Sequence, residues 1–356
     1  MPSRVLIAPD KYKGTLSASD AARAIARGWA RIRPADRLEL LPISDGGEGF
    51  GQALWDMLGA DSQSIETLDA AHRPCQSAWW WEAASRTAII ESAQVIGLAM
   101  LPPGKFHPFE LDTFGLGKVF ETALGQGADQ FIVGIGGSAT NDGGFGLARA
   151  LGWRFVDGRD HPIERWTELH KLAVVYPPEK TKPPAVTVAV DVQNTLLGAS
   201  GATRVYGPQK GLRPDDLEMA ERCLERLALV MKQQFKTDFA GTPGAGAAGG
   251  LGFGLRAFLD ARIEPGFELL AEKAGLEGKL SGSDLVVTGE GAIDESTLMG
   301  KGVGQLARRC QALGIPCIGL GGSVGDSART SGLFSSLESL TNLTRQFKSI
   351  SVKRKN

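Results

Sequence analysis

The chain has 356 residues, of which 42% are hydrophobic, so it is long enough for about two domains with separate cores. Its 39 basic and 40 acidic side chains give a formal net charge of −1, which provides no electrostatic reason to expect nucleic acid or an anionic membrane as a partner. The four cysteines show no CxxC spacing and only four histidines are present, which disfavours a zinc site and a disulfide framework. No stretch reaches the apolar length of a membrane span, and we predict a soluble cytoplasmic protein.

The beginning of the chain alternates predicted strands and helices. Strands are expected at Arg4–Pro9 and Leu38–Ile43, and helices at Ser17–Arg33 and Gly47–Leu58. This rapid alternation is typical of a parallel sheet with right-handed crossovers. In such sheets the functional loops follow the carboxyl ends of the strands.

The middle of the chain has a different pattern. Short antiparallel strands are expected at Gln76–Glu82 and Arg86–Glu91. The other strands predicted here are 130–134, 153–156, 173–176 and 185–190, and the predicted helices are 113–126, 215–235, 251–260 and 267–274.

The end of the chain returns to the opening rhythm, with a strand at Asp284–Val287, a helix at Val303–Leu313 and a strand at Pro316–Leu320. We therefore predict an α/β protein of two domains. Residues 1–64 plus 283–356 are expected to form a discontinuous, Rossmann-like domain, in which helices cover both faces of a parallel sheet. Residues 65–282 are expected to form an inserted α/β domain with a mixed sheet.

Five glycine-rich segments stand where predicted strands end, and four of them carry a carboxylate. They are ISDGGEG (43–49), GIGGSATNDGG (134–144), DVQNTLLGASG (191–201), GAGAAGGLGFG (244–254) and TGEGAIDEST (288–297). Glycine lets backbone amides close on an anionic ligand, and carboxylates beside such amides suit a magnesium-bound phosphate. The combination indicates an enzyme that handles a phosphorylated, metal-complexed substrate.

The first segment places Asp45 and Glu48 at the start of a predicted helix. A helix cap would explain one such residue, because Ser and Asp are common there. Two carboxylates and three glycines within seven residues exceed what a cap requires, so we favour a functional role.

The second segment can form a tight loop in which Gly136 and Gly137 expose successive amide groups. Ser138 and Asn141 can hydrogen-bond phosphate or metal-bound water, and Asp142 can bind Mg²⁺. A predicted helix follows, so its positive end faces the loop. The segment is neither a Walker A loop nor a GxGxxG dinucleotide turn.

Two later segments add further candidates. Asp191 and Asn194 follow an apolar strand, where a carboxylate suits a general base or a metal ligand, although a helix cap explains Asp191 equally well from this segment alone. Downstream, Arg204 and Lys210 form a possible anion clamp, and Ser92 follows another apolar strand as a candidate for binding a small polar substrate.

The last glycine-rich segment places Glu290 and Asp294 around a turn, with Lys301 before the next helix. A lysine in such a turn can meet phosphate as a point charge, although a solvent-facing lysine is the commoner outcome. Near the start, Lys11 and Lys13 alternate in an extended loop, so one of the two is expected to face the site.

Taken together, these segments resemble the bacterial glycerate kinase family. The matching stretches run in order over roughly residues 4–325: APDKYKGTLSA, PISDGGEGF, ESAQVIGL, TFGLG, GIGGSATNDGG, DVQNTLLGASGATRVYGPQKG, GAAGGLGFGL, TGEGAIDESTLMGKG and GLGGSVG. The resemblance implies a two-domain α/β enzyme that transfers the γ-phosphoryl group of ATP to glycerate with Mg²⁺, at a site lined by these segments in the interdomain cleft. After Gly325 the chain is shorter, more polar and more basic than this family's pattern.

We combine this resemblance with the placement of polar residues at strand ends to assign expected roles. The catalytic candidates are Asp191 as the base, with Lys13 and Asp45. The glycerate-binding candidates are Glu48, Ser92, Asn194, Arg204 and Lys210, the nucleotide and phosphate candidates are Gly136, Gly137, Ser138, Asn141, Glu290 and Lys301, and the metal candidates are Asp142 and Asp294.

Two other functions stay open. A kinase for another small hydroxy acid or polyol could use the same scaffold, and a non-catalytic nucleotide-sensing module would bind ATP without needing paired carboxylates at several strand ends. The family resemblance favours 2-phosphoglycerate as the product, and the sequence leaves both a monomer and a homodimer open.

Overall fold

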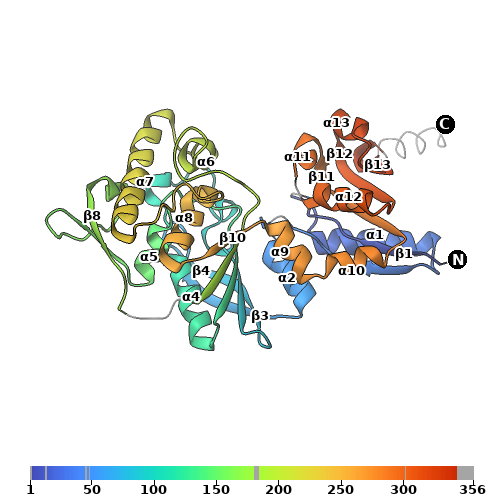
Figure 1. Ribbon diagram of the computed structural model, residues 1–356, viewed down its shortest axis with the longest axis horizontal. Coiled ribbons are helices and arrows are strands. Elements are labelled where there is room, and N and C mark those ends of the chain that lie inside the picture. Colours follow the sequence, from blue (N-terminus) through green and yellow to red (C-terminus); the bar gives the residue numbers. More distant parts are fainter. Residues whose placement is uncertain are drawn as a thin grey trace. The chain divides into compact units, whose positions relative to one another are not determined.

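The computed structural model describes residues 2–12, 14–44, 46–47, 49–179, 184–300 and 302–342. The chain divides into two compact units (Figure 1). Unit 1 comprises Met1–Asp45, Gln52–Met57 and Phe267–Asn356, and unit 2 comprises Gly46–Gly51 and Leu58–Gly266. The main divisions between the two units fall at residues 57/58 and 266/267. The sequence prediction placed these boundaries later, at 64/65 and 282/283.

Unit 1 contains a sheet of five parallel strands in the order β13-β12-β11-β1-β2. The strands are β1 (Arg4–Ile7), β2 (Arg37–Leu40), β11 (Leu285–Ile293), β12 (Cys317–Val324) and β13 (Ser336–Ser339). β1 from the start of the chain pairs with β11 from its end, as Figure 1 shows in blue and orange. The helices are α1 (Ala18–Ile32), α2 (Phe50–Leu58), α9 (Gly266–Lys273), α10 (Leu276–Ser281), α11 (Glu295–Leu298), α12 (Gly302–Ala312) and α13 (Asp326–Thr330), of which α2 and α9 run across a unit boundary.

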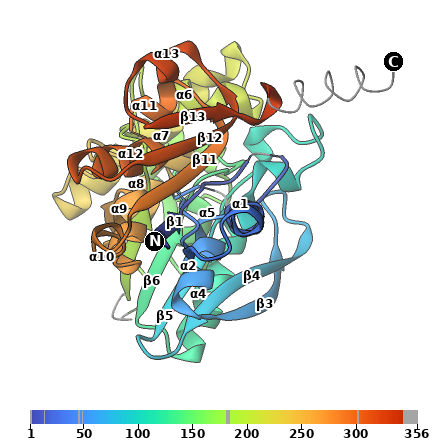
Figure 2. The same ribbon diagram turned by 90° about the vertical axis from the view of Figure 1, so that its right-hand side faces the viewer.

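Unit 2 contains a mixed sheet of six strands in the order β10-β9-β6-β5-β4-β3. The strands are β3 (Asp61–Leu68), β4 (Pro74–Glu82), β5 (Thr87–Glu91), β6 (Gln130–Gly134), β9 (Ala185–Ala189) and β10 (Arg262–Glu264). β10, β9, β6 and β5 are parallel, whereas β4 and β3 run antiparallel to their neighbours. Figure 2 shows β6, β5, β4 and β3 following one another across this sheet.

The helices of unit 2 are α3 (Ala93–Ile96), α4 (Gly115–Gln126), α5 (Phe145–Ala150), α6 (Ala202–Lys210), α7 (Pro214–Phe235) and α8 (Ala247–Leu259). Three 3₁₀ turns lie at Leu98–Met100, Pro108–Glu110 and Trp166–Lys171, and β7 (Arg154–Asp157) pairs with β8 (Leu172–Tyr176) in a separate antiparallel ribbon.

The cores follow from the apolar runs of the strands. In unit 1, Val5, Ile7 and Val287 pack with Ala22 of α1. In unit 2, Phe120 of α4 stacks on Phe131 of β6 with ring centroids 4.9 Å apart, so the helix is fixed on the sheet by apolar burial. The prediction of an α/β fold with one parallel and one mixed sheet is confirmed.

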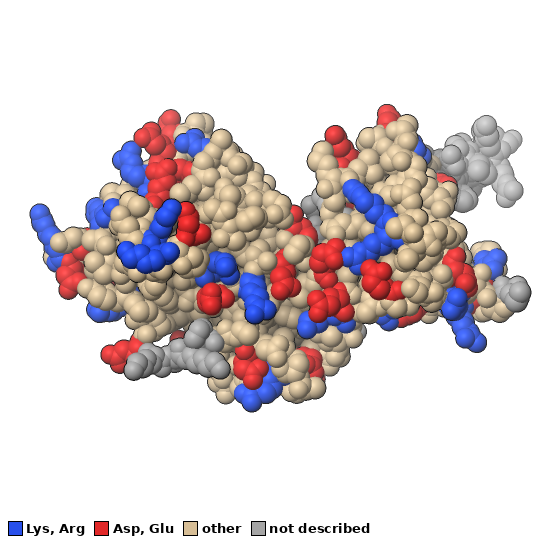
Figure 3. Space-filling view, in the orientation of Figure 1, with Lys and Arg blue, Asp and Glu red and all other residues tan. Residues whose placement is uncertain are grey.

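The charged side chains on the molecular surface are of both signs. On the face shown in Figure 3, acidic and basic groups are interspersed over each unit, as expected for a chain with a net charge of −1. Within the described residues, no helix combines the length and the apolar character needed to cross a membrane.

Candidate active site

The carboxyl edge of the unit 2 sheet brings together three of the sequence segments. β5, β6 and β9 are adjacent parallel strands, so the residues that follow them meet at one edge. These are Ser92, the glycine loop 134–144 and Asp191. The first two are joined by backbone hydrogen bonds, because the Ser92 amide donates to the Gly134 carbonyl at 2.9 Å and the Leu98 amide donates to the Gly137 carbonyl at 2.9 Å.

Residues 46–51 lie against the same edge of unit 2. Glu91, which is 1% exposed at the end of β5, accepts hydrogen bonds from the amides of Gly49 at 2.8 Å and Gly51 at 3.3 Å. A Cβ on Gly136 would lie 2.6 Å from the Cα of Gly47, so a side chain there would force the two backbones apart. Glu91 therefore caps the start of α2 and positions this segment.

Two of the predicted catalytic and substrate residues in that segment, Asp45 and Glu48, lie outside the described residues. Their neighbour Gly46 is described and has a φ of +84°. A Cβ on Gly46 would lie 2.9 Å from the carbonyl oxygen of Ala189, the last residue of β9. Gly46 thus lies next to the strand end that Asp191 follows.

Asp142 is a fully buried residue of the glycine loop. Its Oδ2 accepts hydrogen bonds from the Thr113 amide at 2.9 Å, the Thr113 hydroxyl at 2.7 Å and the Gly146 amide at 2.9 Å, and its Oδ1 accepts one from the Gly144 amide at 3.3 Å. Burial, with a contribution from Asp112, raises the pKa of Asp142 to about 6. Both oxygens already serve protein donors, so this geometry argues against the prediction that Asp142 binds metal and gives it a structural role.

Lys210 at the end of α6 is also buried, with 7% of the residue exposed. Its Nζ donates to the Thr140 carbonyl at 2.6 Å and lies 3.5 Å from the Ser138 hydroxyl. Burial lowers the pKa of Lys210 to about 7, against an opposing effect of Asp142. The amino group thus stabilises the glycine loop by hydrogen bonding. This argues against the prediction that Lys210 pairs with a substrate carboxylate. The Ser138 hydroxyl is hydrogen-bonded to the Thr140 hydroxyl within the loop and donates to the Ala248 carbonyl of α8.

Asn141 is fully buried, and its two amide atoms differ in their surroundings. Its Nδ2 donates to the Thr203 hydroxyl at 3.1 Å, whereas its Oδ1 has no hydrogen-bond partner in the part of the chain that the structure describes. A buried acceptor without a partner is costly, which is a reason to expect a ligand or water there. Because the remaining atom is an acceptor, it suits a hydroxyl group or metal-bound water better than a phosphate oxygen.

Ser92 and Asp191 differ in burial. Ser92 is fully buried, and its hydroxyl lacks a hydrogen-bond partner among the described residues. Asp191 is half-buried and follows β9 after Val190. The edge therefore offers a hydroxyl, an amide oxygen and a carboxylate from three neighbouring loops.

The two remaining substrate candidates of unit 2 lie near α6. Asn194 donates to the Ser200 carbonyl at 2.7 Å and accepts from the Tyr206 hydroxyl at 2.6 Å, so its amide stabilises the 191–201 loop. Arg204 is exposed on α6 and its charge acts on Glu221.

Two further predicted residues, Glu290 and Asp294, lie in and directly after β11 of the unit 1 sheet. Glu290, which is 9% exposed, accepts a hydrogen bond from the Thr297 hydroxyl at 2.7 Å. Asp294 is half-buried and caps α11, because its Oδ1 accepts from the Ser296 amide at 2.8 Å and the Ser296 hydroxyl at 2.5 Å. Lys13 and Lys301 lie outside the described residues.

A metal site formed by protein side chains alone is not present in the described ranges, where no three His, Cys, Asp or Glu residues are arranged to hold an ion. Mg²⁺ usually keeps several waters and binds one or two carboxylates together with substrate phosphates. Glu290 within β11 and Asp294 directly after that strand are carboxylates of the type that Mg²⁺ binds.

Comparison with known proteins supports the family resemblance carried by the sequence motifs. The sequence profile of the glycerate kinase family matches residues 5–354. The chain belongs to the glycerate kinase family. It is 37% identical over 325 residues to a glycerate kinase of Halalkalibacterium halodurans, covering 90% of this chain and 86% of that protein. It is 36% identical over 330 residues to glycerate 2-kinase of Escherichia coli, covering 91% and 86%.

A solved structure extends this similarity to the fold. The putative glycerate kinase 2 of Salmonella typhimurium LT2 superposes with a TM-score of 0.84 at 35% identity, covering 95% of this chain and 90% of that chain. The family membership predicted from the motifs is therefore confirmed, and the chain is an enzyme of the glycerate kinase family.

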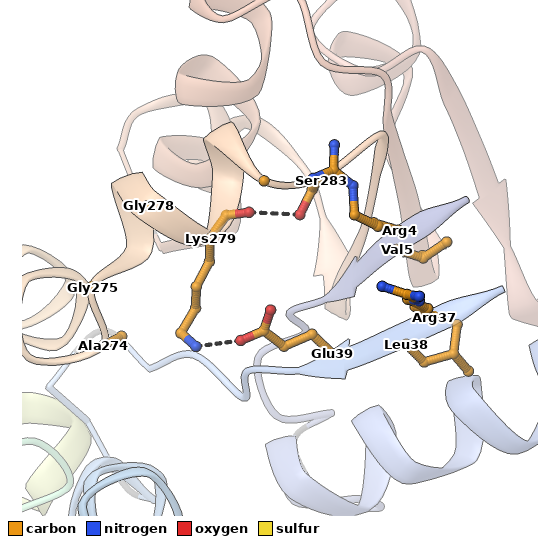
Figure 4. Close-up of a pocket in the computed structure, with 11 residues that line it drawn as sticks. Arg4, Val5, Arg37, Leu38, Glu39, Ala274, Gly275, Gly278, Lys279 and Ser283 are labelled. Carbon is orange, nitrogen blue, oxygen red and sulfur yellow. Dashed lines mark hydrogen bonds and ion pairs between the residues drawn. The ribbon is translucent and has the colours of Figure 1, made fainter. Parts of the chain in front are cut away.

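A hollow of about 450 Å³ in unit 1 is separate from these motifs. It is lined by Arg4 and Arg37, which open β1 and β2, and by Lys279 of α10, as Figure 4 shows. Lys279 pairs with Glu39, and Arg4 pairs with Asp284 at 3.2 Å. Because the hollow lies at the amino ends of the strands and holds none of the glycerate kinase motifs, we leave it outside the candidate site.

The structure adds buried polar residues that sequence reasoning missed, namely Thr113, Thr203 and Glu221. Glu221 lies on α7 among charged neighbours, which is typical of a solvated helix face. A signal was nevertheless present, because Glu221 precedes Leu224 and Ala228 by three and seven residues and so falls on the apolar stripe of the helix.

Proposed function

We propose that this chain transfers the γ-phosphoryl group of ATP to a hydroxyl of D-glycerate and releases ADP and 2-phosphoglycerate. The observation that carries the proposal is the carboxyl edge of the unit 2 sheet. There Asp191 stands beside a glycine loop, together with the Ser92 hydroxyl and the Asn141 Oδ1, neither of which has a partner among the described residues. Membership of the glycerate kinase family supports the choice of substrate.

Glycerate would be recognised by the groups that the protein leaves available. A small acid with two hydroxyls needs acceptors for its O–H groups, and Asn141 Oδ1 and the Ser92 hydroxyl can supply them. Its carboxylate needs a cation, for which we propose exposed Arg204 rather than buried Lys210. Asp191 would accept the proton of the attacking hydroxyl.

The nucleotide phosphates would be bound by hydrogen-bond donors, and their negative charge would be balanced by cationic groups. The amides of Gly136 and Gly137 can bind phosphate oxygens, and we propose that Lys301 and Lys13 add positive charge. When bound, Mg²⁺ would offset the negative charge that develops during phosphoryl transfer. Asp294, which caps α11 through its Oδ1, and Glu290 would hold it directly or through water.

The proposal is tested by measuring ADP release with D-glycerate, tartronate and glycerol as acceptors. We expect D-glycerate to give the highest kcat/KM, because it alone combines a carboxylate for Arg204 with two hydroxyls. A higher value with tartronate or glycerol would favour a kinase for another hydroxy acid or polyol. ATP binding without ADP release on any acceptor would favour a nucleotide-sensing module.

A further inference from the structure

The fifth glycine-rich segment, 244–254, carries no carboxylate, and the proposed reaction assigns no role to it. Near the start of α8 it contains three successive residues with left-handed backbone angles, Ala248, Gly249 and Gly250, whose φ values are +55°, +69° and +87°. Glycine adopts such angles readily, whereas alanine is strained because its Cβ approaches the following carbonyl oxygen. Strained residues persist only where the surrounding structure holds them, and they cluster at functional sites.

The left-handed turn 248–250 packs directly against the glycine loop that carries Asn141. A Cβ on Gly249 would lie 1.9 Å from the Thr140 carbonyl oxygen and 2.7 Å from the Cα of Asn141. A Cβ on Gly250 would lie 2.9 Å from the Cα of Gly143. Neither position has room for a side chain, so the two backbones can approach this closely only because glycines stand here.

Two hydrogen bonds join the left-handed turn to the loop, one on either side of Asn141. Before Asn141, the Ser138 hydroxyl donates to the Ala248 carbonyl at 3.2 Å. After it, the Gly143 amide donates to the Gly249 carbonyl at 3.1 Å. The backbone at Asn141 therefore lies between two contacts with the same turn.

The other contacts of Ser138 also lie within the protein. The residue is 5% exposed, and its hydroxyl accepts a hydrogen bond from the Thr140 amide at 3.2 Å. The Thr140 hydroxyl lies 3.1 Å away, where either oxygen can be the donor. A hydroxyl has one proton, so a Ser138 that donates to Ala248 has no donor left for a phosphate oxygen. This argues against the phosphate contact predicted for Ser138.

We propose that Ser138 and the left-handed turn 248–250 are positioning elements, which hold Asn141 where its Oδ1 can accept a hydrogen bond from the bound hydroxy acid. Asn141 is fully buried, and this oxygen has no partner among the described residues. A small displacement of such a group lowers the rate strongly, because the reacting groups lose their alignment. The effect on turnover rests on the proposed function, whereas the effect on the loop does not.

Ser138→Ala removes the hydroxyl that joins the loop to Ala248 and adds no bulk. We expect it to lower kcat/KM for D-glycerate at least tenfold. Ser62→Ala is the matched control, because Ser62 is exposed on β3, and it should stay within twofold of the unsubstituted enzyme. A Ser138→Ala enzyme within twofold of normal would overturn the proposal.

A double variant tests whether Ser138 acts through Asn141. Asn141→Ala removes Oδ1, and we expect it to lower kcat/KM for D-glycerate at least tenfold by itself. In that background Ser138→Ala should cost less than a further threefold, because the group that it positions is already absent. A direct contact between Ser138 and a ligand would give losses that multiply, and that result would contradict the positioning role.

Gly249→Ala tests the turn itself, because the added Cβ would meet the Thr140 carbonyl. Gly104→Ala is the matched control, since Gly104 has a similar φ of +68° and no atom lies within 4 Å of its Cβ position. We expect Gly249→Ala to have a kcat/KM at least tenfold below that of Gly104→Ala. Equal values would exclude the turn from the positioning role. A melting curve shows whether Gly249→Ala folds, and if it does not, the Ser138 variants decide the proposal.

If the unsubstituted chain does not phosphorylate D-glycerate, the proposed function fails, and amide hydrogen exchange decides the positioning role alone. The Gly143 amide is the probe, because it donates to Gly249 and not to Ser138. Ser138→Ala should speed its exchange at least tenfold, while Ser62→Ala should not. Unchanged exchange in Ser138→Ala would show that Ser138 does not hold the loop.

Discussion

The two sheet edges that carry the glycerate kinase motifs use their polar side chains in different ways. At the unit 2 edge Asp142 is fully buried and accepts two hydrogen bonds from Thr113, which lies 29 residues away in the sequence. At the unit 1 edge Glu290 accepts a hydrogen bond from Thr297, seven residues further along the chain, and Asp294 accepts hydrogen bonds from Ser296, two residues further along. Asp142, which accepts four hydrogen bonds from the protein, is therefore a structural part of the fold, whereas we propose functional roles for Asp191, Glu290 and Asp294.

The largest expected effect concerns Asp191, the carboxylate at the unit 2 edge that we propose as the general base. We expect Asp191→Asn to lower kcat by a factor of about 100 or more, the usual contribution of a general base, and to leave the KM for ATP nearly unchanged. Steady-state kinetics measures both quantities. Asp129→Asn is the control, because Asp129 is exposed. Turnover close to normal would exclude the base assignment.

Asp142 should affect stability more than chemistry, which separates it from Asp191. Asp142→Ala leaves the two donors of Thr113 and the amides of Gly144 and Gly146 without their acceptor. We expect a loss of about 3 kcal/mol, seen as a fall in Tm of roughly 5–10 °C. Thermal melting tests this against exposed Asp129→Ala. An unchanged Tm together with an increased Mg²⁺ requirement would restore Asp142 as a metal ligand.

Asp294 should show the opposite behaviour. Asp294→Asn keeps an N-cap acceptor for Ser296, and Asn caps helices about as well as Asp, so the Tm should hardly change. The lost charge should raise the Mg²⁺ concentration needed for half-maximal activity about tenfold. A magnesium titration at fixed ATP measures this shift, and an unchanged titration would exclude Asp294 from the metal site.

For Lys210 the expected effect is on the pH dependence of stability and not on turnover. Its pKa is about 7 in the folded chain, against the ordinary lysine value of 10.5 expected for the unfolded chain, so the unfolded chain binds more protons between these values. The free energy of unfolding should therefore rise with pH across this window, by at most about 1.4 kcal/mol per pH unit. Lys210→Met should remove that rise, and exposed Lys171→Met should keep it. Parallel Tm profiles of Lys210→Met and the unsubstituted chain from about pH 7 to 9.5 would contradict the burial argument.

The fold was predictable where apolar runs are strong. The strands at Gln130–Gly134 and Ala185–Ala189 are largely buried and were predicted within a residue. β3 was missed because DSQSIETL is polar, as befits a mostly exposed strand at the edge of the sheet. α6 was missed because it contains Gly207 and Pro208, which normally interrupt helices.

The candidate site was predictable as a set of segments but not as a set of roles. Strand-end placement and glycine content identified the loop with Asn141 and Asp142. Sequence could not show that Thr113 donates two hydrogen bonds to Asp142 or that Lys210 donates to the Thr140 carbonyl, because these contacts depend on three-dimensional packing. Nor could it show that Glu91 is buried and accepts a hydrogen bond from the Gly49 amide.

The most direct test of the account is phosphorus NMR of the product formed from D-glycerate and ATP with magnesium. We predict one new phosphate resonance coupled to the single proton on C2, with ADP formed in equal amount. A phosphate coupled to the two C3 protons would contradict the 2-phosphoglycerate assignment. The absence of any phosphoglycerate would contradict the kinase itself.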